Sequence, residues 1–289
     1  MTIDHATVVL YPSGQTSSVG TVVHLADAGD GRTAVVLDQT AFHPVDTAWP
    51  DQPSDRGTLV LSDDSTIDIV EAVVGASNGD EFLLGRDVSV RTGTEGWTFV
   101  VAHLVEGAAI SKGDTIRVEA DVEYRAALSA GHTACHLASL ALDAALAGAW
   151  RKDAPTDALG APGFDALATQ ESRIVPLGSR DVYRIGKSLR RKGFDPAVLD
   201  DLDAVASRAN LLLAEWIAAG GDAHIECDGP GLADRRAWVC ALPGATVRIP
   251  CGGTHVASLA DLSAVTVSLT STTVEGGLEV VMSTVAIPA

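Results

Sequence analysis

Two short motifs, more than one hundred positions apart, limit what this chain can fold into. The first contains His132 and His136, separated by three residues, and the second contains Cys251 and His255 at the same separation. Residues four apart on a helix project from one face, so the two histidines can hold one ion between them. The glycine pair inside the second motif favours a turn there rather than a helix.

Together these four side chains offer three imidazole nitrogens and one thiolate sulfur, a donor set that suits tetrahedral zinc best among the common metals. We therefore predict one Zn²⁺ per chain, bound by His132, His136, Cys251 and His255. The histidine pair alone is a weak signal, because such a pair on a helix is often only packing, and the second motif is a better one because its glycines let backbone come close to a metal. The two motifs together are a specific signal for a metal site.

At these residues the sequence resembles a known family. The letters HTAxHL at 132–137, paired with CGGTHV at 251–256, are similar to the editing domain of alanyl-tRNA synthetases. They are still more similar to its free-standing relatives, the AlaX-type alanyl-tRNA editing proteins. The resemblance implies hydrolysis, in trans, of the ester that joins serine or glycine to mischarged alanine tRNA. A second, hydrolytic site is needed because a pocket for alanine rejects these amino acids only modestly.

In this mechanism a metal-bound water attacks the ester carbonyl, and we assign no protein base. Thr133 and Thr254 flank the predicted ligands, and we hypothesise that one of their hydroxyls reads the seryl hydroxyl. Gly252 and Gly253 leave space for substrate beside the ion. Gly131, which precedes the first histidine, is expected to let substrate approach in the same way.

Gln52 is a further predicted substrate-binding residue. It lies in a segment that resembles an AlaX loop in which a glycine-rich run precedes Gln-Pro and Asp-x-Gly. Gln52, Pro53, Asp55 and Gly57 match that pattern, but residues 45–51 carry none of its glycines. We considered that Trp49 fills the space that the glycines would leave, and that the segment is only a surface loop.

The net charge of −18 counts against a large nucleic-acid footprint, and no DNA partner is expected. One stretch is the exception, since six of the 20 basic residues lie within 180–192. This concentration predicts contact with tRNA phosphates, with a solvated helix face as the alternative. The predicted tRNA-binding residues are Arg125, which resembles a family position, and Arg184, Lys187, Arg190, Arg191 and Lys192.

A soluble protein is expected from a composition that is 46% hydrophobic and 20% charged. No apolar run is long enough to span a membrane, and the N-terminus has no signal-peptide pattern. Four cysteines without a dense framework fit a reducing compartment. We therefore expect a cytoplasmic protein without a membrane partner. The sequence does not indicate an oligomeric state.

The predicted fold class is α+β. Many short strands between residues 6 and 122 predict a small β-barrel domain over 1–120. Residues 121–289 are predicted to form a metal-binding editing domain, with helices packed on an antiparallel sheet and an insertion around 151–195. Within it we expect helices over 121–150 and 195–219, the second begun by Asp195 and Pro196.

Two other functions stay open. The negative charge and the altered loop at 45–51 would suit a zinc-dependent hydrolase of a small ester or amide. Four protein ligands would saturate tetrahedral zinc, which is typical of structural sites, so a non-catalytic zinc or RNA-binding protein of the same fold is the second alternative.

Overall fold

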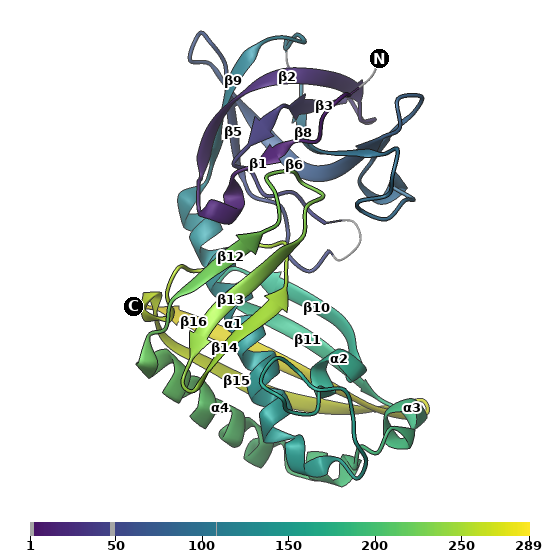
Figure 1. The fold of residues 1–289 in the computed structure, drawn as a ribbon, viewed down its shortest axis with the longest axis vertical. Coiled ribbons are helices and arrows are strands. Elements are labelled where there is room, and N and C mark those ends of the chain that lie inside the picture. Colours follow the sequence, from purple (N-terminus) through teal and green to yellow (C-terminus); the bar gives the residue numbers. More distant parts are fainter. Residues whose placement is uncertain (1–2, 47–49, 108) are drawn as a thin grey trace. The chain divides into compact units, whose positions relative to one another are not determined.

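A computed structural model describes residues 3–46, 50–107 and 109–289, so Trp49 lies outside the described residues. The chain divides into two compact units (Figure 1), and each is described by itself. The first consists mainly of residues 1–126 and 225–237. The second consists mainly of residues 127–224, 238–250 and 255–289. The predicted domain boundary at residue 120 stays a prediction.

The first unit is built around one seven-stranded sheet with the order β5-β9-β2-β3-β8-β6-β7. Its strands are β2 (Ser17–Asp27), β3 (Arg32–Leu37), β5 (Gly57–Val60), β6 (Thr66–Ser77), β7 (Phe82–Leu84), β8 (Thr98–Glu106) and β9 (Thr115–Ala120). The short strands β1 (Val8–Val9) and β4 (Gln39–Thr40) form a separate parallel pair. Alternating apolar side chains such as Val35, Leu37 and Val101 fill the core.

Strand β5 pairs with β6 as well as with β9. The first and the last strand of the row β5-β9-β2-β3-β8-β6 are therefore hydrogen-bonded to each other. The α+β class is confirmed, because the described residues contain several sheets and the helices α1 to α4. A closed barrel is not confirmed and stays a prediction.

Helix α1 (Val122–Ala145) carries the first motif. It begins where the Asp121 carboxylate accepts a hydrogen bond from the backbone N–H of Tyr124, one of the donors that a helix start leaves unpaired. Its alanines and leucines favour the helix, and Leu137, Leu140 and Ala141 are buried along one side. The helix ends five residues before the predicted position at Trp150, in a short 3-10 turn (Ala147–Ala149).

The second unit contains a four-stranded antiparallel sheet with the order β10-β11-β16-β15. Its strands are β10 (Thr169–Val175), β11 (Gly178–Ile185), β15 (Leu262–Val274) and β16 (Gly277–Pro288). Helix α4 (Leu202–Ala219) runs along β15 (Figure 1) and buries Val205, Leu213 and Trp216. This packing agrees with the prediction of helices on an antiparallel sheet.

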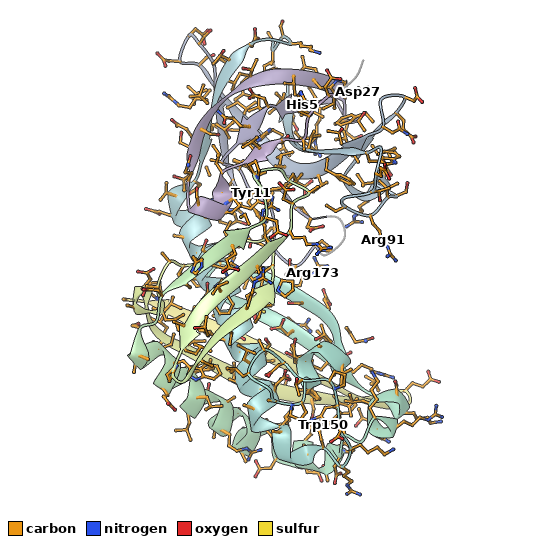
Figure 2. All side chains as sticks on the ribbon, in the orientation of Figure 1. His5, Tyr11, Asp27, Arg91, Trp150 and Arg173 are labelled. Atoms are coloured by element: carbon orange, nitrogen blue, oxygen red, sulfur yellow. The ribbon has the colours of Figure 1, made fainter. Side chains whose placement is uncertain are left out.

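The remaining elements are α2 (Phe164–Ala168), α3 (Lys187–Arg191), β12 (Ala223–Cys227), β13 (Arg236–Leu242) and β14 (Ala245–Pro250). The last three form a sheet with β13 in the middle. The Trp150 ring (Figure 2) contacts Phe194, which in turn contacts Phe164, and these rings pack one end of the second unit. Among the described residues no helix has the length and apolarity needed to cross a membrane.

Residues 151–195, the predicted insertion, contain α2, β10, β11 and α3, and their being an insertion stays a prediction. One sequence prediction in the second unit was wrong. The predicted helix over 195–219 is two helices, because Asp195 caps only a 3-10 turn (Pro196–Asp200) and Asp201 caps α4 through the backbone N–H of Ala204.

Candidate metal centre

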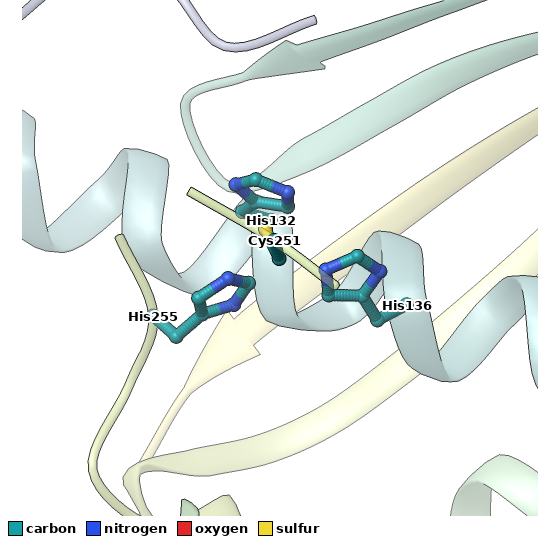
Figure 3. Close-up of side chains that lie close together, drawn as sticks. All are labelled: His132, His136, Cys251 and His255. Carbon is teal, nitrogen blue, oxygen red and sulfur yellow. The ribbon is translucent and has the colours of Figure 1, made fainter. Parts of the chain in front are cut away.

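Three imidazoles and one thiol converge in the structure (Figure 3). The ligand atoms that His132, His136, Cys251 and His255 can offer all lie within 4.8 Å of one another. The first two side chains come from consecutive turns of α1, as their spacing predicts. The other two come from the irregular segment that follows β14, which agrees with the prediction that this motif is not helical.

The three histidine rings are close enough to share one ion. Ring centroids are 4.9 Å apart for His132 and His136, 4.3 Å for His132 and His255, and 5.1 Å for His136 and His255. The buried Nε2 atom of His136 has no hydrogen-bond partner among the described residues. A buried polar nitrogen without a partner is costly, and coordination to a cation would satisfy it. The residues present therefore fit a metal ion.

Burial sets the protonation of two of these groups. It lowers the pKa of His136 to about 4, so the ring is neutral near pH 7 and has a lone pair to offer. Burial also raises the pKa of the Cys251 thiol to about 12, with smaller contributions from the charges of Asp46 and Asp51. A thiol with so high a pKa binds a cation with release of its proton.

Thr133 connects the two segments of the site. Its buried hydroxyl accepts a hydrogen bond from the backbone N–H of Val256 at 3.1 Å and lies 3.3 Å from Nδ1 of His255. A bond to Nδ1 fixes the ring and leaves Nε2 for a metal, an arrangement typical of metal-binding histidines. The structure therefore places this hydroxyl against protein groups.

Gln52 and Thr254 are brought together by two hydrogen bonds. The Gln52 amide donates to the Thr254 hydroxyl at 3.0 Å and accepts from the Thr254 backbone N–H at 3.1 Å. Both residues are buried, and the amide nitrogen also lies 3.5 Å from Nδ1 of His43. Gln52 thus holds the segment that carries the second motif.

Arg125 is buried, away from the position expected of a phosphate contact. Its guanidinium donates to both carboxylate oxygens of Asp55 and to the Ala41 carbonyl. Asp55 also accepts from the backbone N–H of His43 at 2.6 Å. The pair therefore shapes the loop before β5, in a geometry that satisfies a buried ion pair.

The glycines of the two motifs have different surroundings. A Cβ on Gly131 would lie 2.4 Å from the Val175 carbonyl oxygen and 2.6 Å from that of Gly178, so this glycine allows α1 to pack against the β10–β11 turn. The expectation that it gives substrate access to an ion was wrong. Gly252 differs, since a Cβ there would meet nothing within 4 Å, and the residue is exposed. Gly253 is buried.

The other predicted tRNA-binding residues lie on β11 and α3, all within the second unit. Lys187, Arg190, Arg191 and Lys192 are exposed at α3 and its C-terminal end. Arg184 is half-buried and donates to the Glu275 carbonyl. The exposed four therefore offer a compact group of cations.

Sequence reasoning gave no role to Trp238, a fully buried residue of β13. Its ring centroid lies 5.1 Å from that of His136 and 5.6 Å from that of His255. Its strand is recognisable in the sequence, but no local pattern indicates which side chain of a strand will meet a distant helix.

No protein-family model matches the chain. Over 256 residues, 87% of this chain, it is 26% identical to an alanine–tRNA ligase of Halobacterium salinarum, and over 174 residues, 56% of the chain, it is 31% identical to that of Ruegeria pomeroyi. The matches cover 22% and 18% of those ligases, so the chain spans only about a fifth of their length.

A third relative is similar in size to this chain. The alanyl-tRNA editing protein AlaX-M of Pyrococcus horikoshii is 26% identical over 230 residues, which cover 79% of this chain and 76% of that protein. The resemblance predicted from the two motifs is thereby confirmed. Over most of its length the chain resembles an AlaX-type alanyl-tRNA editing protein.

Proposed function

We propose that this protein is a zinc-dependent deacylase that hydrolyses the aminoacyl ester of alanine tRNA mischarged with serine or glycine, acting in trans. The observation that carries the proposal is the convergence of His132, His136, Cys251 and His255 within 4.8 Å. The similarity to an alanyl-tRNA editing protein over three quarters of both chains supports the substrate class.

A zinc ion held by these four residues would supply Lewis-acid polarisation of the ester carbonyl and activation of a water. The protein's own contribution is to fix the donors before substrate binds. Helix α1 sets the spacing of the first pair, Thr133 holds His255, and Gln52 holds Thr254. We assign the hydroxyls of Thr133 and Thr254 this orienting role, and no protein base is assigned.

Substrate is proposed to reach the site over the backbone of the second motif. Gly252 is exposed and has open space where a side chain would stand, so an ester could approach there without displacing protein atoms. Gly253 belongs to the same backbone segment, and Gln52 contributes by holding Thr254 in place. Tight approach to the backbone is the usual reason for glycine beside a reacting group.

The tRNA contact is proposed for the cations at α3. Lys187, Arg190, Arg191 and Lys192 are exposed together in a chain of net charge −18, where a local patch is needed to attract phosphates. Half-buried Arg184 belongs to the same proposed surface, whereas Arg125 is excluded from it by its bonds to Asp55. Replacing Arg190, Arg191 and Lys192 by Gln should weaken tRNA binding and flatten its salt dependence.

The decisive experiment is deacylation of alanine tRNA charged with serine, glycine or alanine, with and without a chelator. Hydrolysis of the two wrong esters should be lost with the chelator and in His136→Ala, whereas alanyl-tRNA is spared. His224→Ala is the matched control, because it removes an exposed histidine outside the candidate centre. Metal content and thermal unfolding are measured on every sample.

Each alternative has its own outcome. Metal-loaded, folded protein that neither hydrolyses these esters nor binds tRNA in a salt-dependent way would favour a hydrolase of small esters or amides, which the net charge of −18 would suit. Tight zinc binding that supports folding, without any hydrolysis, would favour a structural zinc protein.

A further inference from the structure

Trp238 and His136 share a ring contact that the proposed chemistry does not use. The indole is fully buried, and its plane lies at 28° to the imidazole with the ring centroids 5.1 Å apart. The same indole lies 5.6 Å from the His255 ring, at 32°. Both distances are within the range of stacked aromatic pairs. The indole ring therefore contacts two of the candidate ligands.

His136 needs such a contact more than His255 does. Metal-binding histidines are ordinarily oriented by a hydrogen bond from the ring nitrogen that does not bind the metal. His255 has this bond, through Nδ1 and the Thr133 hydroxyl. The His136 ring shows no such bond among the described residues, because its buried Nε2 has no partner and no hydrogen bond to its Nδ1 is found there. Packing must then determine how that ring is turned.

We infer that Trp238 is the positioning residue for His136, and that stacking on its indole replaces the hydrogen bond that the ring lacks. The inference rests on the proposed metal centre. Without the indole, the imidazole can rotate about its side-chain torsions, and the donor nitrogen leaves the position that a shared ion requires.

The aromatic face of Trp238, and not its N–H group, carries this effect. The indole Nε1 is buried and has no acceptor among the described residues. Phenylalanine keeps a flat aromatic ring at the position and loses the N–H together with part of the ring area. Leucine fills part of the same volume but offers no ring face. The two variants therefore distinguish an effect of aromatic stacking from an effect of side-chain volume.

The experiment measures Co²⁺ and Zn²⁺ affinity, by competition with a chromophoric chelator, and the visible spectrum of the Co²⁺ form. Trp238→Leu should weaken binding by about tenfold or more, the usual consequence of losing a group that orients a ligand, and should change the Co²⁺ spectrum. Trp238→Phe should keep the metal affinity and the Co²⁺ spectrum close to those of the wild type. Trp216→Leu is the matched control, because it removes a buried tryptophan of α4 that has no ring contact with the candidate ligands.

A second measurement compares only the wild type and Trp238→Phe. Co²⁺ quenches indole fluorescence at short range, and the chain has five tryptophans. Wild-type emission should fall on Co²⁺ binding, and Trp238→Phe should abolish most of that fall while binding Co²⁺ normally. Equal quenching in the two proteins would place Trp238 away from the ion and overturn the inference.

Three further outcomes are distinguishable. Wild-type affinity in folded Trp238→Leu would overturn the positioning role and leave the proposed function intact. Equal losses in the Phe and Leu variants would mean that stacking is not the cause, which also overturns it. A wild-type protein that binds neither metal would contradict the proposed function itself.

Discussion

The two halves of the candidate centre are built in different ways. His132 and His136 stand on α1, where the 24-residue helix fixes their spacing through its own backbone. Cys251 and His255 stand on a segment without regular structure, which follows β14. Residues remote in sequence hold that segment, since Gln52 binds Thr254 and Thr133 binds Val256 and His255.

This difference predicts different ways to damage each half. The helix half tolerates the loss of single hydrogen bonds, because many backbone bonds share the task, but it depends on how closely α1 packs against its neighbours. The loop half depends on a few side-chain bonds, and each of these can be removed by one substitution. Each of the following predictions tests one side of this contrast.

The largest effect is expected from Gly131→Ala in the helix half. Alanine gains about 1 kcal/mol in helix propensity, but the added methyl group meets backbone oxygens at 2.4 and 2.6 Å. Those atoms belong to the β10–β11 turn and cannot move like a flexible side chain. We expect the free energy of unfolding to fall by about 3 kcal/mol, measured by urea denaturation.

Gly148→Ala is the control, because a Cβ there meets nothing within 4 Å. Its stability should stay within about 0.5 kcal/mol of the wild type. A Gly131→Ala protein as stable as this control would show that the helix can shift freely, and the contrast between the halves would be lost.

The next effect is expected from Gln52→Met in the loop half. Methionine has a similar length but cannot accept the bond from the Thr254 backbone N–H or donate to its hydroxyl. Leaving a buried N–H without this acceptor should cost about 2 kcal/mol of unfolding free energy. Zinc affinity should also fall, because the second motif is no longer held. Exposed Gln170→Met is the control and should change neither quantity.

The smallest effect on folding is expected at Thr133, where the two halves meet. Thr133→Val keeps the volume and removes the hydroxyl, whereas Thr133→Ser keeps the hydroxyl and removes a methyl group. Valine should weaken zinc binding about tenfold by releasing His255, and serine should preserve affinity even if stability falls. The reverse order of the two affinities would show that packing, not hydrogen bonding, holds His255.

The sequence predicted the elements whose patterns are local. Apolar alternation indicated strands in the first unit, helical spacing indicated α1, and the paired glycines indicated that the second motif is not helical. Strand β11 was missed because its inward side chains include Ser179 and Asp181, which are polar and break the expected alternation. They are tolerated inside because the Asp181 carboxylate accepts bonds from the hydroxyls of Ser172 and Ser179. Those partners are invisible in a hydropathy pattern.

By itself, the sequence determined the donor set and its spacing, because three histidines and one cysteine at fixed intervals are a property of the chain alone. Only the tertiary structure decided what surrounds them. It gave Gly131 a backbone neighbour, turned Arg125 inward to Asp55 and placed Trp238 against His136. The physical reason is that packing joins residues far apart in the chain, and side chains of one type then receive opposite roles according to what they meet.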